Sequence, residues 1–131
     1  MSKFKPTDAE IEILQLLWEK GPSSVRDIND SLNAKRDVGY TTTLKLMQIM
    51  NEKGIVKRDT AARSHIYKAV AKENDTKNNL ISDFVKVAFN GSAMSMVMQA
   101  LGNTSSSQGE LDELKSLISK LENNTRQKHA Q

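Results

Sequence analysis

Short polar side chains stand at the start of a helical pattern that runs from Tyr40 or Thr41 to about residue 53. At 100° per residue, one side of this pattern carries side chains that donate and accept hydrogen bonds: Thr41, Thr42, Lys45 and Gln48. Such groups can bond base edges or phosphates in DNA, and a threonine methyl can pack on the thymine methyl. The alternative is that the threonines only cap the helix.

The other side of this helix is expected to be buried. It carries Thr43, Leu44, Leu46, Met47 and Met50. Gly54 follows as the residue that ends the helix. The pattern therefore predicts a helix that packs by its apolar side and presents a short, polar side to a partner.

Two helices precede it. Residues 7–20 begin with a capping box, in which Thr7 and Glu10 satisfy each other's free backbone N–H groups, and they end at Gly21. Residues 24–34 follow, with a serine cap and apolar residues at helical spacing. Trp18, at the end of the first helix, is expected to lie in the core.

A β-hairpin is predicted next, with strands at 55–58 and 65–70 and a loop between them. Three helices followed by a hairpin are the order of a winged helix-turn-helix, whose third helix enters the major groove. In such a fold, cations near the hairpin and the second helix would contact phosphates, although edge-strand charge can also serve to prevent aggregation. These cations are Arg26, Lys57, Arg58 and Arg63, with Lys35 and Arg36 as weaker candidates.

The second half of the chain reads as short amphipathic helices that can hardly close a core alone, so a second copy of the chain is expected to cover them. A heptad seam near the end supports this expectation. The predicted dimer interface is Leu80, Ile81, Phe84, Val85, Ala88, Met94, Val97, Leu101, Leu111, Leu114, Ile118 and Leu121. We expect a mainly α fold with a small β-hairpin: a DNA-binding domain at 1–72, a helical dimerisation domain at 73–124 and a disordered tail at 125–131.

The charge distribution and the absence of certain residue types limit the classes of function that the chain can have. Residues 1–72 hold 13 Lys/Arg and 9 Asp/Glu, whereas residues 73–131 hold 6 and 7, so the positive charge lies in the first half. The 131 residues include no cysteine, which excludes disulfides and thiolate chemistry. Neither a phosphate-binding glycine loop nor a nucleophile motif is present. We therefore expect no enzyme, no cofactor, no metal and no membrane span, and a cytoplasmic location.

The stretches "TDAEIEILQLLWEKGPSSVRDI" and "YTTTLKLMQIMNEKGIVKR" closely resemble the penicillinase repressor family, of the BlaI, MecI and CopY type. The shared features include the Trp and Gly-Pro that end the first helix, the Tyr-Thr-Thr entry to the third, and an Arg in the wing before "HIY". The resemblance implies a homodimeric repressor of resistance or stress genes that binds a palindromic operator. It carries the base-reading role over to Thr41, Thr42, Lys45 and Gln48.

The chain departs from the family at three points. Lys45 stands where threonine is frequent, so the operator sequence is expected to differ. The region "MSMVMQAL" lacks the Asn-Phe pair at which antibiotic-resistance members are cleaved, and the cysteine cluster of the copper-responsive members is missing.

The competing hypothesis is a winged helix that binds only proteins, which predicts no salt-dependent binding to duplex DNA.

Overall fold

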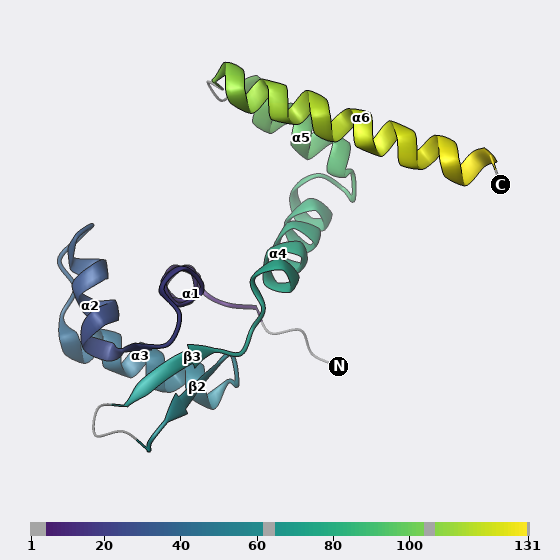
Figure 1. Ribbon diagram of the computed structural model, residues 1–131. Helices are drawn as coiled ribbons and strands as arrows, with labels where there is room; N and C mark the ends of the chain where they lie inside the picture. Colours follow the sequence, from purple (N-terminus) through teal and green to yellow (C-terminus); the bar gives the residue numbers. More distant parts are fainter. Residues whose placement is uncertain (1–4, 62–64, 104–106, 131) are drawn as a thin grey trace.

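The computed structural model describes residues 5–61, 65–103 and 107–130. The first part is a winged helix, and the second is a set of helices that leads away from it (Figure 1). The winged helix contains α1 (Asp8–Lys20), β1 (Ser23–Ser24), α2 (Val25–Asn33), α3 (Tyr40–Glu52), β2 (Val56–Asp59) and β3 (Ile66–Ala69). The second part contains α4 (Glu73–Ala88), α5 (Ala93–Asn103) and α6 (Gln108–Ala130).

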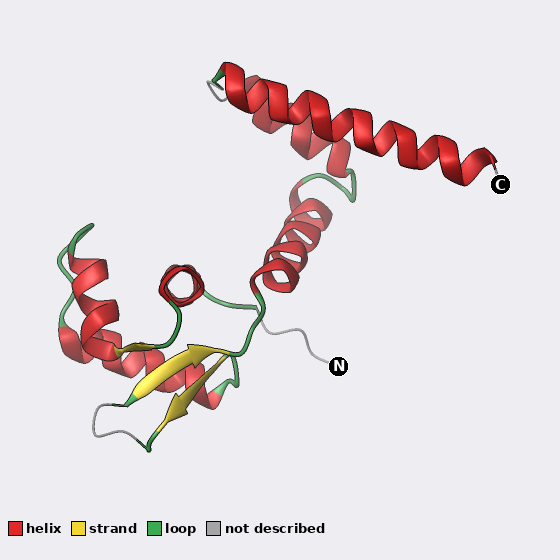
Figure 2. Ribbon diagram, in the orientation of Figure 1, coloured by secondary structure: helices red, strands yellow, loops and turns green. Residues whose placement is uncertain are grey.

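The three N-terminal helices and the hairpin confirm the fold expected from the sequence. The capping box at the start of α1 is present: the Glu10 N–H donates to the Thr7 hydroxyl, and the Thr7 N–H donates to the Glu10 carboxylate. The sheet adds a strand that the sequence did not predict. Ser23 and Ser24 pair with β3, so the order is β1-β3-β2, antiparallel throughout (Figure 2). A strand of two serines has no alternating pattern by which it could be recognised.

The core lies between the three helices and the inner face of the sheet. Its fully buried side chains come from every element of the winged helix except β1. Trp18 packs at the edge of this core, as expected, and its indole N–H donates to the Ala71 carbonyl at 2.9 Å. This bond ties α1 to the segment that leads into α4. The core residues are Ile13, Leu14, Leu17, Val25, Ile28, Leu32, Met47, Met50, Ile55, Val56 and Tyr67.

A buried carboxylate in α1 is paired with a lysine at the end of α3. Glu10 is 2% exposed, and its Oε2 lies 2.8 Å from the Nζ of Lys53, at the end of α3. Burial raises the pKa of the Glu10 carboxyl, but hydrogen bonds from Lys53 and Thr7 and the charge of Lys53 outweigh it, so the net pKa lies below its ordinary value of 4.5. The ionised form is therefore favoured by the folded state.

In the variant Glu10→Gln, the free energy of unfolding is expected to fall less steeply as the pH is lowered. A carboxyl whose pKa is lower in the folded state stabilises the fold fully above its unfolded pKa, and this contribution is lost as the pH falls below 4.5 through the folded value. The free energy of unfolding, measured by urea titration between pH 7 and pH 3, should fall less steeply in the variant. Glu19→Gln, which removes an exposed carboxylate from the same helix, is the control. An unchanged slope in Glu10→Gln would contradict the prediction.

The C-terminal helices expose much of their apolar surface. Of the large hydrophobic residues exposed in the described chain, all but Tyr40 and Val70 lie on α4, α5 and α6. None of the described helices combines the length and the apolar character that crossing a membrane requires. The exposed apolar side chains are thus concentrated in the second part of the chain.

The last helix, α6, continues to Ala130 and so runs through most of 125–131, the stretch for which the sequence predicted a disordered tail. Glycine and proline are absent from 122–130, and extending a helix that has already formed adds one hydrogen bond for each residue that is fixed. The Thr125 hydroxyl also donates to the Leu121 carbonyl at 2.9 Å. The sequence prediction relied on missing apolar anchors, which decide packing and not helix formation.

Candidate nucleic-acid interface

The polar side of α3 is exposed as the sequence predicted. Thr41, Thr42, Lys45 and Gln48 are all exposed, and they follow one side of the helix from its first turn to its third. The opposite side enters the core through Thr43, Met47 and Met50, with Leu44 and Leu46 half-buried. The helix therefore offers two hydroxyls, an amine and an amide on one continuous strip of surface.

Thr43, the third threonine of the run, is fully buried, and its hydroxyl has a hydrogen-bond partner inside the core. Its hydroxyl accepts a hydrogen bond from the amide Nδ2 of Asn29 at 2.8 Å, and Asn29 is itself buried in α2. The same Nδ2 donates to the Val38 carbonyl at 3.1 Å, and Asn33 both donates to this carbonyl and accepts from the Val38 N–H. The two asparagines thus hold the turn between α2 and α3 and fix where α3 begins. Sequence reasoning missed this network, because its bonds cross from one helix to the next.

A cation and an aromatic ring meet beside the first turn of α3. The Arg26 guanidinium carbon lies 5.8 Å from the centre of the Tyr40 ring, within the range of a cation–π contact. Both side chains are exposed, so the guanidinium keeps its hydrogen-bond donors free toward solvent. The contact places Arg26, a predicted phosphate ligand, next to Thr41 at the start of the polar strip.

Tyr40→Ala is expected to weaken DNA binding about two- to fivefold, because an exposed cation–π contact contributes about 0.5–1 kcal/mol and restrains the Arg26 side chain. Tyr40→Phe retains the ring and should bind like the wild type. Fluorescence anisotropy with a labelled duplex measures both. In an Arg26→Ala background the Tyr40→Ala change should have little further effect, and a full additional loss there would show that the tyrosine acts independently of Arg26.

The hairpin supplies further cations at the side of α3. Lys57 is exposed and Arg58 is half-buried. The Arg58 backbone N–H donates to the Asn51 side chain at 3.1 Å, which joins β2 to the last turn of α3. Arg63 lies outside the described residues.

Arg36, which the sequence left open as a contact to the DNA backbone, forms an ion pair on the surface of the chain. Its guanidinium Nη1 lies 2.5 Å from Oε2 of Glu12 in α1. The Arg36 hydrogen bond lowers the pKa of the Glu12 carboxyl below its ordinary value. Arg36 therefore braces α1 against the end of α2. Lys35, beside it, is exposed.

The residues predicted to form the dimer interface differ in their solvent exposure. Val85 is 6% exposed, so its side chain is buried within its own chain, and its assignment to a dimer surface is corrected. Its backbone carbonyl accepts from the N–H groups of Phe89 and Gly91 at the end of α4. Leu80 and Leu114 are half-buried. The exposed members are Ile81, Phe84, Ala88, Met94, Val97, Leu101, Leu111, Ile118 and Leu121, and the structure adds Val87, Met98 and Leu117.

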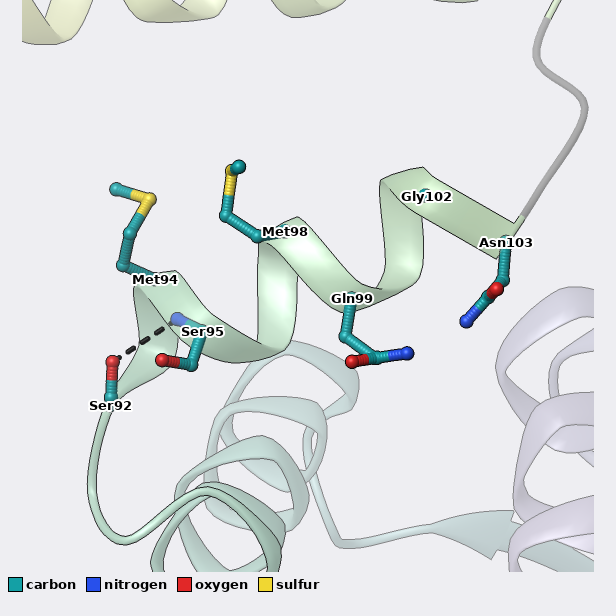
Figure 3. Close-up of a pocket in the computed structure, with 7 residues that line it drawn as sticks. All are labelled: Ser92, Met94, Ser95, Met98, Gln99, Gly102 and Asn103. Carbon is teal, nitrogen blue, oxygen red and sulfur yellow. Dashed lines mark hydrogen bonds between the residues drawn. The ribbon is translucent and has the colours of Figure 1, made fainter.

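An open hollow of about 500 Å³ lies along α5 (Figure 3). Met94 and Met98 project from the same side of the helix, with Gln99 and Asn103 on the other. The Ser92 hydroxyl accepts from the Ser95 N–H at 3.1 Å and caps the helix. In the described part of the chain, no group of three or more His, Cys, Asp or Glu side chains is placed to hold a metal ion.

These features define a winged helix-turn-helix protein of the DNA-binding type, in which α3 presents a polar strip between basic side chains. Comparison with known proteins gives the family. The chain belongs to the penicillinase repressor family, whose model, described as "Penicillinase repressor", matches residues 6–120. The resemblance seen in the sequence is thereby confirmed over both parts of the chain.

Relatives and solved structures agree with this assignment. The chain is 24% identical to the methicillin resistance regulatory protein MecI of Mammaliicoccus sciuri over 117 residues, which cover 89% of this chain and 95% of that protein. It is 30% identical to the transcriptional regulator BlaI of Mycobacterium tuberculosis over 77 residues, 58% of this chain and 56% of that protein.

Two solved structures show the same fold. The DNA-binding domain of the repressor BlaI has a TM-score of 0.50 and 20% identity, covering 57% of this chain and 93% of that one. A MarR family protein from Bacillus stearothermophilus has a TM-score of 0.53 and 18% identity, covering 94% of this chain and 77% of that one. At these identities the likeness concerns the fold alone.

Proposed function

We propose that the chain is a transcriptional repressor that acts in the cytoplasm and binds double-stranded operator DNA as a homodimer. The observation that carries the proposal is the exposed polar strip of α3, on a helix whose other side packs against the core. The strip consists of Thr41, Thr42, Lys45 and Gln48. Family membership supports the repressor role. Relatives of the chain include regulators of methicillin resistance and a penicillinase repressor.

In the proposed complex, α3 lies in the major groove with its first turns toward the base edges. Gln48 suits adenine and Lys45 suits guanine or a phosphate, while the two threonines suit a phosphate or the thymine methyl. Arg26, Lys57 and Arg58 neutralise phosphates on either side, and Arg63 is proposed to do so from the wing. These contacts set the register of the helix in the groove.

The exposed apolar side chains of α4, α5 and α6 support the proposed homodimer, because a second copy would cover them. A two-fold symmetric dimer reads two half-sites in opposite orientation. The operator is therefore proposed to be a palindrome whose half-site centres lie about one helical turn, about 34–36 Å, or a multiple of it apart.

Selection from a random duplex pool by the purified full chain, at two salt concentrations, tests the proposal. A palindromic consensus at both concentrations, with binding that falls steeply with salt, is the expected result. Recovery of unselected DNA, or of none at either salt, would overturn it and favour a protein-binding module. Transcription in vitro from a promoter that overlaps the selected site should then fall on addition of the chain, and a rise would overturn the repressor role.

A further inference from the structure

Two lysines of the hairpin stand directly opposite each other. Lys57 of β2 pairs with Lys68 of β3 in the antiparallel register, and both side chains are exposed. Neighbouring strands lie about 4.7–4.9 Å apart, so paired side chains on one face are in contact range. Like charges placed directly opposite destabilise a sheet. The arrangement therefore weakens the free hairpin.

Neither lysine amine has an oxygen of Asp or Glu within 4.0 Å among the described residues. The nearest acidic residue along the strand is Asp59, whose Oδ1 accepts a hydrogen bond from the Ala61 N–H at 2.9 Å. The two lysines line an open hollow of about 450 Å³, together with Arg58 and Pro22. The lining of this hollow includes three cationic residues and one acidic residue, Asp59, so cations are in excess.

We propose that Lys57 and Lys68 form a paired binding site for backbone phosphates of DNA on the outer face of the hairpin. This rests on the proposed function and extends the DNA surface to Lys68, which the sequence did not indicate as a contact. Two amines on neighbouring strands can hold two successive phosphates, one each. Each amine is a point charge with three donors, which suits phosphate without demanding one orientation.

The like-charge pair gives the site a property that an ordinary solvated lysine lacks. A single exposed lysine on a strand is enough to discourage edge pairing, so edge protection does not require a second lysine opposite the first. When each amine holds a phosphate, the two anions reduce the repulsion between the lysines. Removing one amine should therefore stabilise the free chain and weaken its DNA complex at the same time.

Lys68→Gln tests the proposal with two measurements on the full chain. The slope of log K against log salt for a mixed-sequence duplex should decrease in magnitude by about 0.9, the value for one lost phosphate contact. The midpoint of thermal unfolding of the free chain at low salt should rise, and the difference from the wild type should shrink as salt screens the repulsion. Lys115→Gln, an exposed lysine of α6, is the matched control and should change neither quantity.

The double variant Lys57→Gln/Lys68→Gln should decrease the slope by about 1.8. A wild-type slope in Lys68→Gln, or a thermal midpoint that falls, would overturn the paired site and leave the role of α3 intact. Absence of salt-dependent binding by the wild-type chain would instead overturn the proposed function, so the two failures are distinguishable.

Discussion

Gln48→Ala is expected to lower the preference of the chain for its selected site over mixed-sequence DNA about tenfold to a hundredfold. The amide lies on the exposed strip of α3. Its donor and acceptor suit the two groups that adenine presents in the major groove, and one such bidentate pair contributes about 1–3 kcal/mol of discrimination. Competition binding at one fixed salt concentration, with the selected duplex and a mixed-sequence duplex, measures the preference directly.

Arg58→Ala is the matched comparison for Gln48→Ala. Its guanidinium sits on the hairpin and is proposed to meet a phosphate, so its loss should weaken all duplexes similarly and reduce the salt slope by about one. Thr42→Ala should behave like Gln48→Ala. If all three variants weakened every duplex to the same extent, α3 would not be the element that reads sequence.

The parts of the site that could be predicted are those set by local spacing. The period of the helix separates Thr41, Lys45 and Gln48 from Met47 and Met50, and the structure confirms which side is exposed. The capping box at Thr7 is likewise a local signal, since its two bonds join residues three apart.

The parts that could not be predicted depend on contacts between distant elements. Glu10 reads as a capping residue, but its partner Lys53 lies 43 positions away. Lys68 becomes notable only when the register sets it opposite Lys57, and sequence alone does not fix that register across a long hairpin loop. The ion pair between Arg36 and Glu12 joins residues 24 positions apart, so local spacing in the sequence does not reveal it.

Val85 shows the corresponding limit in the C-terminal helices. Apolar periodicity predicts which side of a helix is buried, but it is silent on whether the cover comes from the same chain or from a partner. Val85 and Phe84 are neighbours in one apolar pattern, yet Val85 is buried within the chain and Phe84 is 55% exposed. The side chains of this apolar pattern that stay exposed in the single chain are those that a dimer would bury.

Ile118→Asp is expected to weaken self-association by at least about a hundredfold. Ile118 is 54% exposed on α6, in line with the other apolar residues of its heptad seam. Burying an isoleucine contributes about 1.5–3 kcal/mol, and two-fold symmetry removes this contribution from both copies. The aspartate also brings a carboxylate into an apolar contact, which adds to the loss. Sedimentation equilibrium over a range of concentrations measures the dissociation constant.

Ser116→Asp is the matched control, because it introduces the same charge on the opposite side of α6 at another exposed position. It should leave the dimer intact. Since Ile118 is exposed in the single chain, Ile118→Asp should preserve the helical circular dichroism, and its operator binding should fall together with its self-association. A variant that remained dimeric would place the interface on α4 or α5, whereas a monomer that bound the full palindrome as tightly as the wild type would show that dimerisation contributes nothing to operator recognition.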